Sequence, residues 1–217
     1  MSVQYAVKRM EDGAGALSLS GEFFPERLSG AYAALEEARI DRYCWGGAYR
    51  PEAFARVGWN AQGLNVLMAA REETIAARET RTGGAVCRDS CLEFFVRPFL
   101  DDARYLNVEV NAAGVAHIGL GAGRADRLVL DRVPEGMDIA VSAHAGAWWA
   151  VSYRLPSALI RALFGRELEP GALMRGNFYT CDETIHPHFG AWSPVDTPAP
   201  DFHQSGYFGY LSLESAR

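Results

Sequence analysis

Two acidic residues on neighbouring predicted strands are the side chains in this sequence best suited to bind or transform a ligand. Glu93 lies in residues 89–97 and Glu109 lies in residues 105–111. Carboxylates accept hydrogen bonds from hydroxyl groups. A pair of carboxyl groups at a defined separation can also act as acid and as base or nucleophile on a glycosidic bond. Both uses require that the two residues share one face of a sheet.

The alternation of apolar and polar residues predicts such a shared face. Successive side chains of a strand point to opposite sides, so residues two apart lie together. The predicted apolar face carries Leu92, Phe94, Val96, Leu106, Val108 and Val110. The polar face then carries the candidate ligand contacts Glu93, Asn107, Glu109 and Asn111, beside Tyr105. A polar row of this kind is either simply solvated or a platform for a ligand.

The composition is that of a folded domain with an acidic surface. Of the 217 residues 49% are hydrophobic, which is ample for a core, and the formal net charge is −6. Nucleic acids and anionic membranes select for basic faces, so neither is an expected partner. No apolar run reaches the length that spans a membrane. The first residues lack the features of a signal peptide, so we expect a cytoplasmic protein, or a secreted one only if its N-terminus was trimmed.

Many short predicted strands, separated by turn-forming residues, position the polar face. One predicted hairpin joins residues 53–59 to 64–70, and a second joins residues 137–143 to 148–155. A closing strand is predicted at 207–213. Apolar spacing predicts a helix at 26–38, weakened by Gly30, and a second at 158–164 with Ser157 as its N-cap. We therefore expect an all-β fold, an antiparallel β-sandwich of immunoglobulin-like or jelly-roll type with one or two short helices. Since no linker or repeat is present, residues 1–217 are expected to form a single domain.

The four cysteines do not form a zinc-binding pattern. They are Cys44, Cys87, Cys91 and Cys181. Structural zinc sites use two closely spaced pairs of ligands, and only Cys87 and Cys91 are close to each other in this chain. Reduced thiols in the core are the better interpretation, and no metal ligand is predicted among them.

Two other groups of side chains offer metal ligands. One is the run Asp182, Glu183, His186 and His188, with His203 later in the chain. Imidazoles and carboxylates bind transition metals, but a polar surface loop is favoured here because no closed set of four ligands is present. Asp101 and Asp102 could bind calcium through their oxygens. No cofactor is expected, with calcium as the one exception left open.

Several motifs in a fixed order carry a resemblance to a known family. They are WNAQGLNVLM, DSCLEFFV, YLNVEVNAAG, WWAVSYRLP, GNFYTC, AWSP and FHQSGYFGYL. Their order and spacing resemble those of carbohydrate-binding module family 9-like domains, most strongly over residues 50–213. Each motif alone is weak, and the specificity lies in the combination. The resemblance implies a β-sandwich that holds a sugar in a slot between aromatic rings, with hydrogen bonds from carboxylates and amides.

The resemblance also implies roles for individual residues. The family's acidic residue corresponds to Glu93, and its strand-ending asparagine corresponds to Asn111. One aromatic platform corresponds to Phe202. Trp192, in the motif AWSP, lies close in sequence to the implied slot and is a further candidate contact.

Three functions remain open. The favoured one is a non-catalytic carbohydrate-binding domain that holds a mono- or oligosaccharide on the polar strand face beside an aromatic ring. The alternatives are a glycoside-processing enzyme that uses Glu93 and Glu109, and a partner-binding sandwich that has lost sugar binding. The last is retained because the chain reads Val86-Cys87 in the region where the resemblance implies a second aromatic platform, a tryptophan, and Glu109 where it implies a basic residue. The oligomeric state is left open.

Overall fold

The computed structural model describes residues 3–144 and 146–215, so Ala145 and the outermost residues of the expected 1–217 domain lie outside it. Its strands are β1 Gln4–Arg9, β2 Ala38–Arg39, β3 Arg42–Gly46, β4 Glu52–Asn60, β5 Gly63–Arg71, β6 Cys91–Arg97, β7 Tyr105–Asn111, β8 Ala116–Gly121, β9 Leu128–Val129, β10 Ala140–Ser142, β11 Trp148–Pro156, β12 Leu173–Asp182, β13 His188–Ala191 and β14 Gly209–Leu213. Its helices are α1 Gly30–Ala33 and α2 Ser157–Phe164, with the short 3-10 helices η1 Pro25–Arg27, η2 Val86–Arg88 and η3 Ser205–Tyr207. Within the described residues no helix has the length and apolarity needed to cross a membrane.

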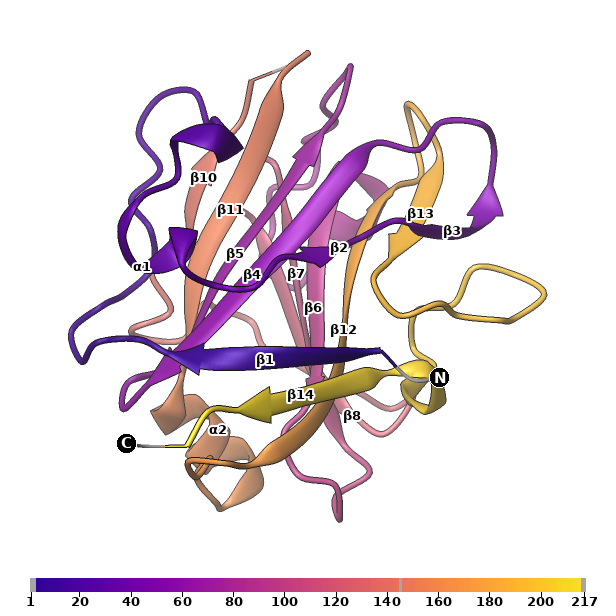
Figure 1. The fold of residues 1–217 in the computed structure, drawn as a ribbon. Helices are drawn as coiled ribbons and strands as arrows, with labels where there is room; N and C mark the ends of the chain where they lie inside the picture. Colours follow the sequence, from indigo (N-terminus) through magenta and orange to yellow (C-terminus); the bar gives the residue numbers. More distant parts are fainter. Residues whose placement is uncertain (1–2, 145, 216–217) are drawn as a thin grey trace.

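One large mixed sheet curls over on itself to form the two layers of a sandwich (Figure 1). The strand order is β10-β11-β5-β4-β1-β14-β12-β6-β7-β8-β9. The strands from β10 to β4 form one layer, and those from β12 to β9 form the other. β1 and β14 run side by side across the front of Figure 1 and connect the two layers. β13 pairs with the C-terminal residues 179–182 of β12 and, on its other side, with β3.

The main core fills the space between the two layers. Val66 and Val151 of the first layer are fully buried there, together with Phe94 and Phe178 of the second. The rings of Phe94 and Phe178 stack with their centroids 4.9 Å apart. Because burial of each such side chain contributes about 1.5–3 kcal/mol, the apolar residues determine which side of each strand faces inward.

The predicted all-β sandwich with short helices is confirmed. β4 and β5 form the first predicted hairpin, and β6 and β7 bury the predicted apolar face. The antiparallel prediction holds for every pairing of the described strands except those of β1, which runs parallel to β14 and to β4. Residues 4–7 of β1 pair with β14 and residues 8–9 pair with β4, so this one strand belongs to both layers.

The helix predicted at 26–38 is wrong, since only η1 and the single turn α1 form there. Gly30 has φ +64°, which a right-handed helix does not continue through. Arg56 also prevents the helix from continuing after α1. Its guanidinium group donates hydrogen bonds to the carbonyl groups of Tyr32, Ala33 and Leu35. A strand of the first layer therefore takes the acceptors that a longer helix would use.

The second predicted helix is confirmed as α2, but its cap is not. Pro156 occupies the N-cap position, and no side chain caps the helix. The hydroxyl of Ser157 instead donates to the carbonyl of Ala61 at 3.2 Å. This hydrogen bond ties α2 to the turn between β4 and β5.

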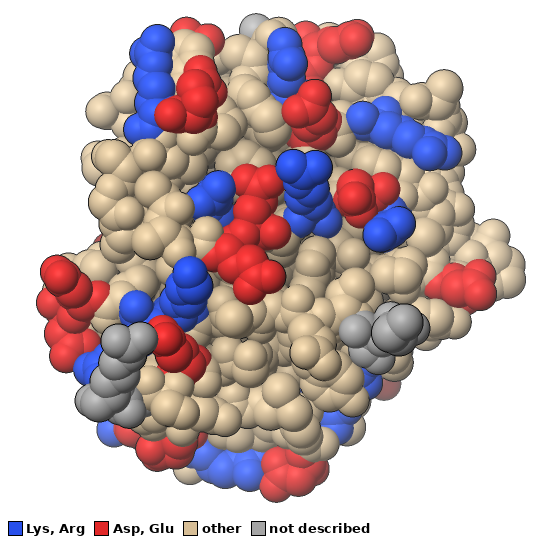
Figure 2. All heavy atoms as spheres, viewed as in Figure 1, with Lys and Arg blue, Asp and Glu red and all other residues tan. Residues whose placement is uncertain are grey.

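Acidic and basic side chains are interspersed on the face of the molecule seen in Figure 2, without a broad basic surface there. Ion pairs among the described residues include Arg56 with Glu37 at 3.0 Å and Arg166 with Asp101 at 2.7 Å. Exposed pairs of this kind contribute only about 0–1 kcal/mol each. The stability of the fold therefore rests mainly on its apolar interior.

Glu72, directly after β5, is a carboxyl group buried inside this apolar interior. Its oxygens accept hydrogen bonds from the hydroxyl of Ser90 and from Nε1 of Trp149, the latter at 2.9 Å. Burial, with a smaller contribution from the nearby carboxylate of Asp182, raises the pKa of Glu72 from 4.5 to about 7, although the two hydrogen bonds oppose the shift. Glu72 is thus protonated in the folded state over a pH range in which the unfolded chain has lost the proton.

We expect Glu72→Gln to flatten the pH dependence of the free energy of unfolding. In the native chain the folded state binds the extra proton between the unfolded pKa of 4.5 and the folded pKa of about 7, so stability falls as pH rises through this window. The loss amounts to roughly 3 kcal/mol for a shift of this size. Urea unfolding below and above the window measures it. Glu73→Gln, at the exposed neighbouring position, is the control, and equal slopes in Glu72→Gln and the native chain would contradict the assignment.

Candidate functional site

The polar side chains of the second layer face away from the main core. Register pairs Glu93 of β6 directly with Glu109 of β7 and with Tyr179 of β12. Directly paired side chains have their Cβ atoms about 4.5–5.5 Å apart. The prediction that the two glutamates share one face is therefore confirmed.

A hollow of about 70 Å³ opens on this face. The strands contribute Glu93, Phe95, Glu109, Cys181 and Phe189 to its lining. Loops and η2 contribute Cys87, Arg124, Glu183, Pro200, Asp201, Phe202 and His203. Segments far apart in sequence thus meet around two glutamates that are only 2% and 6% exposed.

Phe202 supplies the aromatic wall of the hollow. Its ring stacks on that of Tyr179 with centroids 4.0 Å apart and an interplanar angle of 13°. Phe189 packs edge-on against it at 6.3 Å, and Trp45 lies at 5.9 Å. These contacts fix a half-buried ring that still lines the hollow.

The two glutamates differ in their surroundings. Burial raises the pKa of Glu93 well above its ordinary value, and the charge of Glu109 raises it further. The thiol of Cys181 donates to Oε1 of Glu93 at 3.1 Å. Burial also raises the pKa of Glu109, but His117 and a hydrogen bond from Asn107 lower it. Glu109 therefore holds a negative charge more readily than Glu93.

Asn107 positions Glu109 rather than lining the hollow. Its Nδ2 donates to Oε1 of Glu109 at 2.7 Å, and its Oδ1 accepts from Nε of Arg127 at 3.1 Å. Arg127 in turn lies over the ring of Tyr105, 4.4 Å from its centroid. This arrangement needs a glycine on β8, because a Cβ atom at Gly119 would lie 2.5 Å from Oδ1 of Asn107.

Two predicted contacts lie away from the hollow. Asn111 holds the turn after β7, where its Oδ1 accepts from the amides of Ala113 and Val115 and its Nδ2 donates to Asp89 at 2.9 Å. Trp192 is only 8% exposed and packs in the main core against Phe178, with ring centroids 5.5 Å apart. The indole is directed to the opposite side of the sheet from the hollow. The prediction of Trp192 as a ligand contact, which rested on its position in the motif AWSP, is therefore wrong.

Arg124 is a functional candidate that the sequence did not single out, and His203 was singled out only as a metal ligand. Arg124 extends from the loop after β8 and donates to Oδ1 of Asp201 at 3.1 Å. Nδ1 of His203 lies 2.8 Å from the hydroxyl of Tyr105. Burial, together with Arg127 and Arg124, lowers the pKa of His203 to about 4, so its imidazole is neutral near pH 7. The resemblance implied a basic residue at the position of Glu109, and Arg124 brings a guanidinium group to the same hollow from a loop.

Comparison with known proteins places this chain in a family. The model of carbohydrate-binding family 9 matches residues 23–213. The chain belongs to this family. No curated protein has a significant sequence match to it.

Solved structures agree with the assignment to family 9. A protein from Bacteroides uniformis ATCC 8492, described as a candidate carbohydrate-binding protein, is 29% identical, with a TM-score of 0.78 over 99% of this chain and 100% of that one. A family 9 module from Caldicellulosiruptor kristjanssonii in complex with cellotriose is 11% identical, with a TM-score of 0.68 over 99% of this chain and 95% of that one. Its complex with glucose gives 12% identity and a TM-score of 0.65 over 99% and 97%. The module shares the fold of this chain.

The metal ligands considered from the sequence do not assemble as a group. Asp182 and His188 face each other across β12 and β13 and are both buried, whereas His203 lies at the hollow. Asp101 is paired with Arg166. Asp102 is paired with Arg104, which lowers the pKa of that carboxyl to about 2. Two arginines thus occupy the carboxylates that calcium would need.

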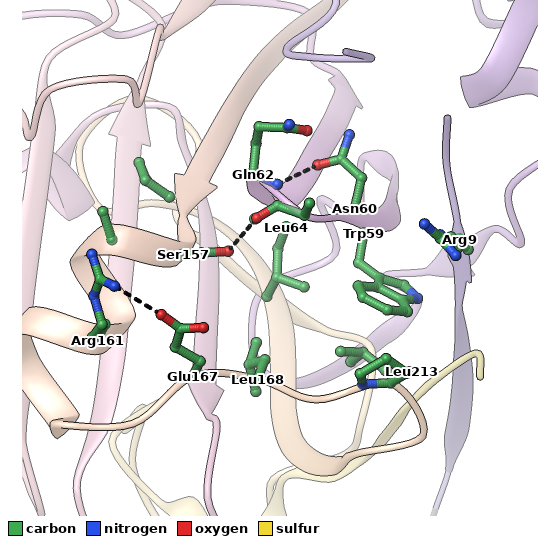
Figure 3. A pocket seen from close by; sticks show the side chains of 15 residues that line it. Arg9, Trp59, Asn60, Gln62, Leu64, Ser157, Arg161, Glu167, Leu168 and Leu213 are labelled. Carbon is green, nitrogen blue, oxygen red and sulfur yellow. Dashed lines mark hydrogen bonds and ion pairs between the residues drawn. The ribbon is translucent and has the colours of Figure 1, made fainter. Parts of the chain in front are cut away.

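A larger groove of about 580 Å³ lies elsewhere, between the β4–β5 turn, α2 and β1 (Figure 3). Its charged groups are mostly engaged with each other, as in the ion pair of Arg161 and Glu167 at 3.0 Å. Trp59 is only 7% exposed, so its ring face is not free to stack on a ligand. The smaller hollow is the better candidate family 9 site because buried carboxyl groups converge with a half-exposed ring there.

We expect Gly119→Ala to destabilise the protein by about 1–3 kcal/mol, the usual cost of overpacking. The added methyl group would displace Asn107 from its position between Arg127 and Glu109. Gly123→Ala is a matched control, since a Cβ atom there meets nothing within 4 Å. Urea unfolding of both variants gives the comparison. Equal stability of the two would show that Asn107 moves aside without cost.

Proposed function

We propose that the hollow binds a carbohydrate, as the non-catalytic ligand site of this family 9 protein. The observation that carries the proposal is the convergence of Glu93, Glu109 and the ring of Phe202 on one hollow. Sugars present hydroxyl groups for carboxylates and C–H faces for aromatic rings, and this hollow offers both kinds of partner. The relatives in complex with cellotriose and glucose support the same ligand class.

Each lining residue has a role in this proposal. Glu109, which holds its charge more readily, accepts hydrogen bonds from sugar hydroxyls, and Glu93 lies beside it. Arg124 donates from the rim, and Phe202 stacks against the apolar face of a sugar ring. At about 70 Å³ the hollow is small beside the roughly 300–1,000 Å³ of pockets that enclose drug-sized ligands. It therefore encloses only part of one sugar unit, free or at the end of a chain, and leaves no room for a long segment.

Binding is favoured over hydrolysis by the placement of the two carboxyl groups. A glycosidase places its acid and its base or nucleophile on either side of the scissile bond. Glu93 and Glu109 are only 2% and 6% exposed in a hollow of about 70 Å³, so a glycosidic bond has no room to lie between their carboxyl groups. Release of reducing sugar from cellotriose, abolished by Glu93→Gln, would instead support the enzymatic alternative.

We expect Phe202→Ala to weaken binding of glucose or cellotriose at least about tenfold, which corresponds to 1.4 kcal/mol of lost stacking and apolar contact. Isothermal titration calorimetry measures the affinity, and thermal unfolding checks that the variant is folded. Phe24→Ala removes a phenylalanine of similar burial far from the hollow and should leave the affinity unchanged. Equal affinities of Phe202→Ala and the native protein would place the sugar elsewhere.

A second variant distinguishes the hollow from the groove of Figure 3. Glu109→Gln removes a charged acceptor, and hydrogen bonds to charged groups are worth about 1.5–3 kcal/mol, so sugar affinity should fall at least about tenfold. Glu167→Gln alters the groove and should have no effect. The reverse result would assign sugar binding to the groove. Absence of any sugar response in the native protein would favour a partner-binding role.

A further inference from the structure

Two cysteine thiols and one glutamate carboxyl group, all buried, converge beside the hollow. The sulfur atoms of Cys91 and Cys181 and a carboxylate oxygen of Glu93 all lie within 4.8 Å of one another. The three residues are at most 2% exposed. The contact between Sγ of Cys181 and Oε1 of Glu93 is 3.1 Å. All three are potential metal ligands, and they come from only two strands.

Strand register builds this cluster. Cys91 of β6 and Cys181 of β12 are direct partners in the antiparallel pair, so their side chains lie together on one face. Glu93 follows Cys91 by two residues and therefore points to the same side. Because the ligands come from the interior of paired strands, the backbone holds them in place without a dedicated loop.

The charge around the cluster favours a cation. Glu109 is the direct partner of Glu93, and Glu183 lines the same hollow. Arg124, His117 and Arg127 are the positive or titratable groups near this acidic pair, and Arg124 is already bonded to Asp201. The three acidic side chains Glu93, Glu109 and Glu183 create a negative potential around the cluster that attracts a divalent cation.

The site is also accessible. Glu93 and Cys181 both line the hollow, so an ion can reach them from solvent without opening the core. The half-buried Cys87 lines the hollow too, and its carbonyl lies 3.3 Å from Sγ of Cys181. A water molecule from the hollow would complete a set of four ligands.

We propose that Cys91, Cys181 and Glu93 form a binding site for a thiophilic divalent cation of the zinc class. Thiolate ligands select such ions, whereas calcium and magnesium prefer oxygen. In a tetrahedral zinc site with bonds of about 2.3 Å, neighbouring ligand atoms lie about 3.8 Å apart. The three candidate ligand atoms lie within 4.8 Å of one another, close to that spacing. The spacing of the cysteines along the chain does not reveal the site, because two of its ligands meet only through sheet pairing.

Titration of the reduced, metal-free protein with Co²⁺ tests the proposal. Thiolate coordination in a tetrahedral site gives a sulfur-to-cobalt charge-transfer band and intense visible bands, and we expect both at one Co²⁺ per chain. Zn²⁺ should displace the cobalt and abolish the bands. A native protein that gives no charge-transfer band overturns the proposal.

Variants identify the ligands. Cys44→Ser/Cys87→Ser leaves only the two buried cysteines and should retain the thiolate band, so this test does not disturb the core. Cys181→Ala and Glu93→Gln should lower the affinity for Co²⁺ at least about tenfold, with thermal unfolding as the check on folding. Loss of the band in the double variant would assign the metal to Cys44 or Cys87 and overturn the proposal.

The metal site and the sugar site share Glu93, but the tests are independent. The cobalt spectrum involves no sugar, and the calorimetric test of sugar binding is made without metal. Either proposal can therefore fail while the other stands. If both hold, metal and sugar should compete, because each uses the carboxylate of Glu93.

Discussion

The pairing of β6 with β7 and β12 is the constraint on which both the core and the candidate site depend. It buries Phe94 and Phe178 on one side and brings Glu93, Glu109 and Cys181 together on the other. A slip of one residue in this pairing would turn every side chain of a strand to the opposite face. Glutamates would then enter the apolar core. The free-energy cost of burying their charges disfavours the slipped pairing and so maintains the geometry of the hollow.

The strands were predictable because their two faces differ in polarity. Alternation in β6 and β7 predicted the apolar side that packs in the core and the pairing of Glu93 beside Glu109. The helix at 26–38 failed because apolar spacing says nothing of a positive φ at Gly30 or of the distant Arg56 that binds its carbonyl groups. The parallel pairing of β1 could not be foreseen either, since its two partner strands lie in different layers.

The candidate site was only partly predictable for a similar reason. Glu93 and Glu109 follow from local alternation, and Phe202 from the motif that carries the resemblance. Arg124 and Cys181 reach the same hollow from a loop and from a strand that pairs across a long sequence separation. Position in a single strand predicts the face of a side chain, but it does not predict which other segments cover that face.

The connection of the two layers through β1 and β14 has a consequence for how the protein folds during synthesis. Gln4 pairs with Tyr210, and the amide of Arg9 donates to Glu214 across a separation of 205 residues. On the ribosome, β1 must wait for almost the entire chain to emerge before it finds this neighbour. Until then the edges of β4 and β12 are open templates for pairing with other chains. A sheet closed by such distant contacts folds slowly, so chaperones that shield nascent edges would benefit this protein more than one built from local hairpins.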